Sequence, residues 1–169
     1  MPTKKTMEKA RRAKREGKAP TSQAGEFVRE EMHKIRRGEH GARSTKQAIA
    51  IGLSKARRAG VDLPPPEAGE TSERTRQSAK RAYEAGQKRP GAKPSARRSR
   101  AITAALKREG KTAASRTALS RQAKSAARKR TAAERSESAR KAARTKGPEG
   151  RRAAARKAAQ TRAARAHSG

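Results

Sequence analysis

Hydrophobic residues in the N-terminal part of the chain recur with the spacing of an amphipathic helix. Between residues 24 and 37 the larger apolar positions are Phe27, Val28, Met32 and Ile35. Val28, Met32 and Ile35 follow the i, i+4, i+7 spacing that places side chains on one face of a helix. Gly38 comes next, and glycine suits the left-handed position that ends many helices. The pattern predicts a first helix over residues 24–37.

A second amphipathic stretch follows after a short polar connection. Ser44 and Gln47 have the spacing of a capping box, in which each side chain bonds a free backbone N–H at the start of a helix. The apolar positions behind it are Ala48, Ile49, Ile51, Leu53 and Ala56, and Gly60 follows as a stop signal. Two short helices joined by residues 38–43 predict a helical hairpin whose apolar faces meet.

The hairpin is followed by a segment that disfavours helix. Residues 61–69 contain three consecutive prolines, which favour an extended and semi-rigid connector. A third and mostly polar helix is predicted from Ser72 to Ala85, closing at Gly86. This helix either packs onto the hairpin or stands free of it.

From Ser95 onward the sequence alternates Ala with Arg or Lys, all of which are good helix formers. The natural breaks are Gly110 and the Gly147–Pro148 pair, with Pro148 suited to the first position of a last helix. Residues 139–146 (ARKAARTK) recur as residues 155–162 (ARKAAQTR). We interpret this likeness as one compositional rule repeated, because such sequence generates matches easily.

The shortage of large apolar side chains limits how much of this pattern can fold. Leu, Ile, Val and Phe together account for only 11 of 169 residues, well below the roughly 20% at which a highly charged chain is expected to be disordered. The predicted fold class is therefore mainly α, with a small N-terminal helical hairpin and a largely disordered or conditionally helical basic tail. The predicted segments are a basic arm (1–20), the hairpin module (21–63), a linker with a possible short helix (64–94) and the polycationic tail (95–169).

Charge indicates the class of partner. The formal net charge is +32, of which +22 falls in residues 88–169 and +10 in residues 1–87. A chain of this kind is attracted to polyanions, and nucleic acid is the leading candidate. We expect the tail to bind phosphate backbones without sequence preference and to compact DNA. The predicted contacts are Arg97, Arg98, Arg100, Lys107, Arg108, Arg116, Arg121, Lys124, Arg128, Lys129, Arg130, Arg140, Lys141, Arg144, Arg151, Arg152, Arg156, Lys157, Arg162 and Arg165.

Other chemistries find little support in the residues. The chain has no cysteine, and no phosphate-binding glycine loop or nucleophile elbow occurs, so we expect no enzyme, no cofactor and no metal. His33 and His40 lie near Glu30, Glu31 and Glu39, but their spacing matches no metal site, and we expect solvent-exposed polar residues there. A membrane-surface helix needs bulky apolar residues where this chain has alanine, so membrane binding is not expected.

Two alternatives to DNA binding remain open. Sequence-specific RNA modules stack bases on aromatic rings, but only Phe27 and Tyr83 are aromatic here. A protein that binds structured RNA or the ribosome through backbone phosphates fits the same composition. In the other alternative the hairpin is an adaptor that docks a protein partner through Val28, Ile49 and Leu53, while the tail only localises it.

The string KQAIAIGLSKARRAG at residues 46–60, with GEFVREEMHKIRRGEHGARS before it, resembles a family of small basic bacterial proteins classed as a domain of unknown function. The resemblance covers residues 25–66 and implies a bacterial cytoplasmic setting and a compact helical unit. The tail is similar in composition to the Ala-rich basic tails of linker histones and bacterial histone-like proteins. Because the charge indicates DNA as the partner, we expect association with the nucleoid.

Overall fold

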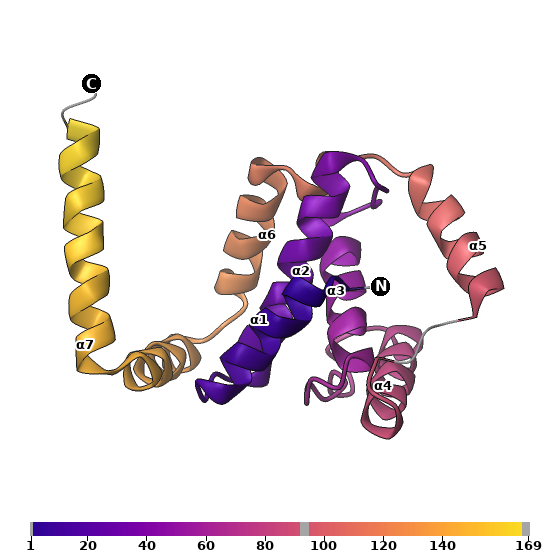
Figure 1. Ribbon diagram of the computed structural model, residues 1–169, viewed down its shortest axis with the longest axis horizontal. Coiled ribbons are helices and arrows are strands. Elements are labelled where there is room, and N and C mark those ends of the chain that lie inside the picture. The colour runs from indigo at the N-terminus through magenta and orange to yellow at the C-terminus, as the bar shows by residue number, and fades with distance from the viewer. Residues whose placement is uncertain (1, 92–94, 167–169) are drawn as a thin grey trace. The chain divides into compact units, whose positions relative to one another are not determined.

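The computed structural model describes residues 2–91 and 95–166, and these form seven α-helices, one short 3-10 helix and no extended strand (Figure 1). The expected class, mainly α, is confirmed. The chain divides into two compact units, residues 1–124 and 125–169. Part of the predicted linker, residues 92–94, lies outside the described residues.

The predicted hairpin is present and consists of α2 (Pro20–Arg37) packed against α3 (Thr45–Arg58). Helix α2 begins four residues earlier than its apolar pattern indicates, because Pro20 stands at its first turn, where no N–H is needed. It ends at Gly38, whose φ of 78° is left-handed. The two helices approach closely at Gly52, where an added Cβ would lie 2.7 Å from the Cα of Val28.

The start of α3 is capped much as its sequence predicts. Ser44 Oγ accepts a hydrogen bond from the Gln47 backbone N–H at 3.2 Å. Gln47 Oε1 accepts in return from the backbone N–H of Arg43 at 2.7 Å, one residue before the expected partner. At the other end the backbone N–H of Gly60 bonds the carbonyl of Arg57 at 3.0 Å, and Gly60 has a φ of 87°. Both predicted boundaries of this helix are confirmed.

Residues 1–20, expected as a basic arm, include the helix α1 (Lys4–Arg15), which packs along α2. Its buried face consists of small residues, namely Thr6, Ala10 and Ala13. The side chain of Glu30 on α2 accepts a hydrogen bond from the Thr3 backbone N–H at 3.1 Å. The basic side chains of this segment therefore project from a docked helix.

Helix α4 (Glu73–Lys88) packs against α3 through Ala79, Ala82 and Gly86. The prediction that this helix closes at Gly86 is wrong, because the helix continues through it to Lys88. A Cβ at Gly86 would lie 1.8 Å from the carbonyl oxygen of Arg57. Glycine is therefore needed here for the close approach of α4 to the end of α3, and it does not act as a stop.

The proline-rich connector is held against the same helix end. The buried guanidinium of Arg57 donates to the carbonyls of Leu63 and Pro64, each at 3.0 Å. Burial lowers the pKa of Arg57 from its ordinary value, but a guanidinium stays charged at any physiological pH. The hydroxyl of Tyr83 on α4 donates to Asp62 at 2.7 Å, so the connector is tied to two helices.

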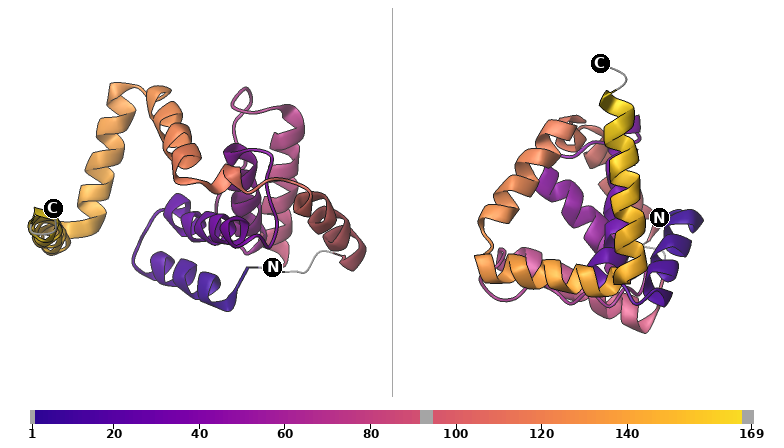
Figure 2. Two further views of the ribbon diagram at one scale, coloured as in Figure 1. Left: turned by 90° about the horizontal axis from the view of Figure 1, so that it is seen from above. Right: turned by 90° about the vertical axis from the view of Figure 1, so that its left-hand side faces the viewer.

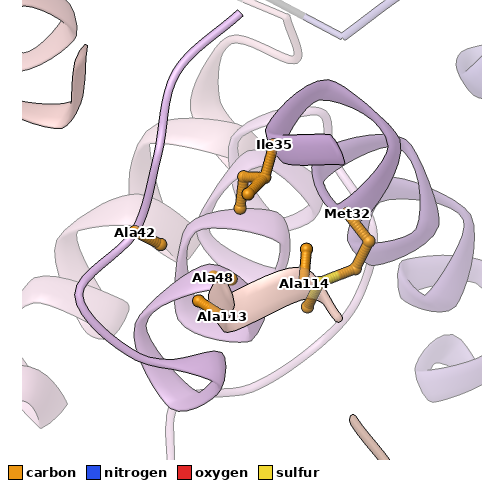
Figure 3. Close-up of a cluster of buried hydrophobic side chains, with 6 residues drawn as sticks. All are labelled: Met32, Ile35, Ala42, Ala48, Ala113 and Ala114. Atoms are coloured by element: carbon orange, nitrogen blue, oxygen red, sulfur yellow. The ribbon is translucent and has the colours of Figure 1, made fainter. Parts of the chain in front are cut away.

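The buried apolar residues form two small clusters. The first cluster consists of Met32, Ile35, Ala42, Ala48, Ala113 and Ala114 (Figure 3). Val28, Ile49 and Leu119 pack against it. The second cluster consists of Ala10, Ala24, Phe27, Ala56 and Val61, with Met7, Leu53, Ala59 and Leu63 around it. Most of these side chains are small, so close helix contacts replace bulk in both clusters.

The expected disorder of the basic tail is not supported, because its described residues are largely helical. They form α5 (Ala96–Lys107), η1 (Thr112–Ala114), α6 (Arg116–Arg128) and α7 (Ala132–Ala166). Local signals account for this without a large core: alanine has the highest helix propensity, and hydroxyl side chains cap the helices. Ser115 accepts from the Ala118 N–H at 3.1 Å, and Thr131 accepts from the Glu134 N–H at 3.2 Å.

The predicted break at Gly147–Pro148 is confirmed. Gly147 has φ 66° and ψ 173°, which no helix allows, so α7 consists of two helical segments with Pro148 opening the second. Figure 2 shows the change of direction at this point. Among the described residues, no helix is long and apolar enough to cross a membrane.

Candidate nucleic-acid interface

All twenty predicted contact residues lie among the described residues and all are exposed. Helix α5 or its end carries Arg97, Arg98, Arg100, Lys107 and Arg108. Helix α6 carries Arg116, Arg121, Lys124 and Arg128, and the turn after it carries Lys129 and Arg130. The other nine are on α7. Within the described ranges only Arg152 of these twenty forms an ion pair, with Glu149 at 2.8 Å.

The segment between α5 and α6 is joined to the hairpin by backbone hydrogen bonds. The N–H of Gly41 donates to the carbonyl of Leu106 at 2.8 Å, and the N–H of Ala42 donates to the carbonyl of Gly110 at 3.0 Å. A Cβ at Gly41 would lie 1.9 Å from the carbonyl oxygen of Glu109. The two backbones therefore meet at a distance that only glycine permits.

Two side chains of the hairpin fix the next turn, η1. The hydroxyl of Thr45 donates to the carbonyl of Ala113 at 2.7 Å in a buried bond, and Nε of Arg36 donates to the carbonyl of Ala114 at 2.8 Å. Both alanines are buried in the first cluster (Figure 3). Part of the predicted polycationic tail is therefore a structural component of the N-terminal unit.

This docking gives α6 an inner side and an outer side. Leu119 packs against the first cluster, and Ala118 and Gln122 beside it are half-buried. The outer side is slightly hollowed and lined by Arg116, Thr117, Ser120, Arg121 and Lys124. Three cations and two hydroxyls thus share one surface, and α6 contains no Asp or Glu.

None of the residues of α5, α6 and α7 is buried, but α6 differs from the other two because its half-buried Leu119 packs against the first cluster. In the second segment of α7, Arg and Lys are distributed around the helix axis with no apolar side. The two sequence repeats have the same local bond: Thr145 donates to the carbonyl of Lys141 at 3.0 Å, and Thr161 to that of Lys157 at 2.9 Å. Helix α7 therefore presents cations in every direction.

A charged cluster that the sequence pattern did not predict lies at the centre of the hairpin. Glu31, expected to be solvent-exposed, has only 1% of its surface exposed. Its carboxylate is paired with Lys55 of α3, and Oε1 lies 2.9 Å from Nε2 of His40. The expectation failed because Glu31 directly precedes Met32 on the inward side of α2, where its charge is matched by residues distant in sequence. His33, by contrast, is exposed as expected.

The neighbouring Glu30 is also only slightly exposed. It pairs with Lys34, four residues further along α2, at 2.6 Å. Burial raises the pKa of the Glu30 carboxyl, but hydrogen bonds from Lys34, Thr6 and the Thr3 backbone outweigh it, so that pKa is lowered overall. In residues 2–91 and 95–166, no three His, Asp or Glu side chains are placed to hold a metal ion.

The residues considered for an adaptor surface are used within the chain. Val28 and Ile49 pack against the first cluster and Leu53 against the second, each half-buried. Neither aromatic side chain is a free platform for base stacking: Phe27 is 1% exposed, and the hydroxyl of Tyr83 is bonded to Asp62. On α5 and α6, the exposed polar groups are mainly cations and hydroxyls.

Residues 15–67 match a family model described as a family of unknown function (DUF6496). This range contains the hairpin and the proline-rich connector but not the η1 segment that packs on them. No curated protein and no solved structure matches the chain. What the comparisons establish is that residues 15–67 are similar to a family of unknown function.

Proposed function

We propose that the protein binds nucleic acid without sequence preference, by contacts to backbone phosphates, and that duplex DNA is its ligand. The observation that carries this proposal is the exposure of all twenty predicted Arg and Lys contacts on helices that have almost no acidic partners. Cations that are not neutralised within the chain are available to replace the counterions condensed on a polyphosphate.

Two features favour a duplex backbone over single-stranded bases. Binding of single strands relies on aromatic side chains that stack with bases, but Phe27 is buried and Tyr83 is engaged with Asp62. Most of the exposed polar groups on the basic helices are guanidinium, ammonium and hydroxyl groups, which are the usual partners of phosphate oxygens. Neutralising the backbone in this way would compact DNA and keep the protein on the nucleoid.

A salt titration tests the proposal. Binding of the full chain to a random-sequence duplex is measured by fluorescence anisotropy between 50 and 400 mM salt. If about ten cations engage phosphates, log affinity falls against log salt with a slope of roughly −9. A flat salt dependence, or no binding near physiological ionic strength, contradicts the proposal.

A competition assay with the same labelled duplex distinguishes DNA from RNA as the ligand. Double-stranded RNA and duplex DNA of equal length are added as competitors to the labelled DNA complex. We expect DNA to compete at least as well as RNA. If RNA competes at a much lower concentration than DNA, the assignment of DNA is overturned and the protein is one that binds structured RNA.

A further inference from the structure

We infer that the outer side of α6 is a preformed site that holds consecutive phosphates of one strand of duplex DNA. This inference rests on the proposed function and deepens it. It distinguishes a positioned surface, formed by Arg116, Ser120, Arg121 and Lys124 with Thr117, from the many other exposed cations of the chain.

The spacing of the residues defines a line. Arg116, Ser120 and Lys124 are four residues apart, so they recur about every 6 Å along the axis of α6 and span roughly 12 Å. Thr117 and Arg121 form a parallel row beside them on the same side. A line of donors fits the regular row of phosphates along one strand better than it fits an isolated anion.

The surface is held in place by the docking of the preceding turn. The bonds from Thr45 and Arg36 fix η1, and Leu119 packs against the first cluster one residue from Ser120. Binding to a surface that is already ordered costs less conformational entropy than ordering free side chains and backbone. No described residue of α7 packs against either buried cluster in this way.

Another docked basic helix, α1, lacks the same electrostatic character. Glu8 interrupts its basic residues, and Glu16, directly after the helix, lies 3.7 Å from Arg12 and 2.5 Å from Lys18. No acidic residue interrupts the outer side of α6. Of these two docked helices, only α6 presents cations without internal neutralisation.

The test compares two full-length variants that each lose two arginines and one lysine. The face variant is Arg116→Gln, Arg121→Gln, Lys124→Gln, and the control variant is Arg74→Gln, Arg81→Gln, Lys88→Gln on α4, at positions outside the predicted contacts. All six side chains are exposed, and circular dichroism verifies that both variants keep the helix content of the unmodified chain. Affinity for a random-sequence duplex is measured across the salt range used above.

We expect the salt slope of the face variant to be less negative by about 2.7, as for three lost phosphate contacts. The slope of the control variant should change by less than about 1, because it loses the same charge from a helix outside the predicted phosphate contacts. If the unmodified chain binds but the two variants lose equal slope and affinity, the inference fails and the proposed function stands. If the unmodified chain does not bind, both fail.

A second measurement on the unmodified chain does not depend on substitutions. Lysine side chains are acetylated with and without saturating duplex, and the modified positions are located by mass spectrometry. We expect Lys124 to be protected at least fivefold more strongly than Lys157. Equal protection of the two lysines overturns the inference.

Discussion

Glu31 brings a negative charge into the contact between α2 and α3. Lys55 pairs with its carboxylate, and Nε2 of His40 lies 2.9 Å from Oε1, although without the alignment of a hydrogen bond. The other ring nitrogen of His40 lies 3.0 Å from the carbonyl oxygen of Gly41. Both ring nitrogens of His40 therefore lie within 3.0 Å of oxygen atoms.

Replacing Lys55 with methionine leaves the buried carboxylate of Glu31 without its main counter-charge. We expect the free energy of unfolding to fall by about 3 kcal/mol, since breaking a buried pair by removing one partner is strongly destabilising. The control is Lys80→Met, whose exposed pairing with Glu84 spans 3.9 Å and should change stability by at most about 0.5 kcal/mol. Urea unfolding followed by circular dichroism measures both, and equal losses would contradict the role given to Glu31.

Gly86 and Gly25 both lie inside helices, but we expect replacement by alanine to have opposite effects on stability at the two positions. Gly86→Ala places a Cβ 1.8 Å from the Arg57 carbonyl oxygen, so α3 and α4 must separate, and stability should fall by about 1–3 kcal/mol. At Gly25 nothing lies within 4 Å of the added atom, and Gly25→Ala should raise stability by roughly 0.5–1 kcal/mol through helix propensity. Thermal melts of the two variants measure these changes. A change of melting temperature in the same direction for both variants would contradict the close contact at Gly86.

Among the helices, the contact between α1 and α2 depends on a carboxylate. The pKa of Glu30 is lowered in the folded chain. The ionised carboxylate therefore stabilises the fold fully above the ordinary pKa of about 4.5, and this stabilisation is lost as the pH falls below that value. Glu30→Gln should therefore reduce stability at neutral pH and flatten its decline between pH 5 and pH 3. Urea midpoints measured across this range test the expectation, and parallel profiles for the two proteins would contradict it.

The docking of η1 on α2 and α3 predicts that two truncations behave differently. Deleting residues 131–169 removes α7 and the residues that flank it. The melting temperature of the remaining chain should therefore change by a few degrees at most. Deleting residues 95–169 also removes Ala113, Ala114 and Leu119 from the first cluster, so it should lower the melting temperature and speed hydrogen exchange in α2 and α3. Equal stability of the two truncated chains would show that the docking contributes nothing.

The helices could be predicted from sequence where their signals are local. Ser44 with Gln47, the glycines at 38 and 60, and the pair Gly147–Pro148 each act on the backbone within a few residues, and the structure confirms them. Gly86 was misinterpreted because a helix stop and a close helix contact both require glycine, and only the neighbouring helix distinguishes them. The helicity of the tail was underestimated because the prediction of disorder relied on the shortage of large apolar side chains. Helix propensity and capping hydroxyls act locally and do not need those side chains.

The candidate site was only half predictable. The cations of α6 were found by composition, but so were sixteen others, and nothing local marks Arg116, Arg121 and Lys124 as a positioned group. What positions them is Ala113–Ala114, a pair that looks the same as the many other alanine pairs in the chain. A long-range bond such as that from Thr45 to the Ala113 carbonyl, across 68 residues, leaves no periodic signal.

Across the chain, positive charge is shared by both compact units. Residues 125–169 carry 14 Lys and Arg against 3 Glu, and residues 1–124 carry 33 Lys and Arg against 12 Asp and Glu. Each unit is therefore attracted to a polyanion. The difference between them is order: the first unit has buried clusters that fix its helices, and the helix of the second unit has no buried residue.

The burial of Ala113 and Ala114 beside Met32 and Ile35 also affects how the protein is made. A ribosome that adds about 5–20 residues per second needs roughly 4–14 s to proceed from Ala48 to Leu119. During that interval the nascent hairpin has no cover over Met32 and Ile35, and its final apolar contacts form only after the basic segment emerges. The rate of translation between Ala48 and Leu119 thus sets how long an incomplete intermediate with exposed apolar surface persists.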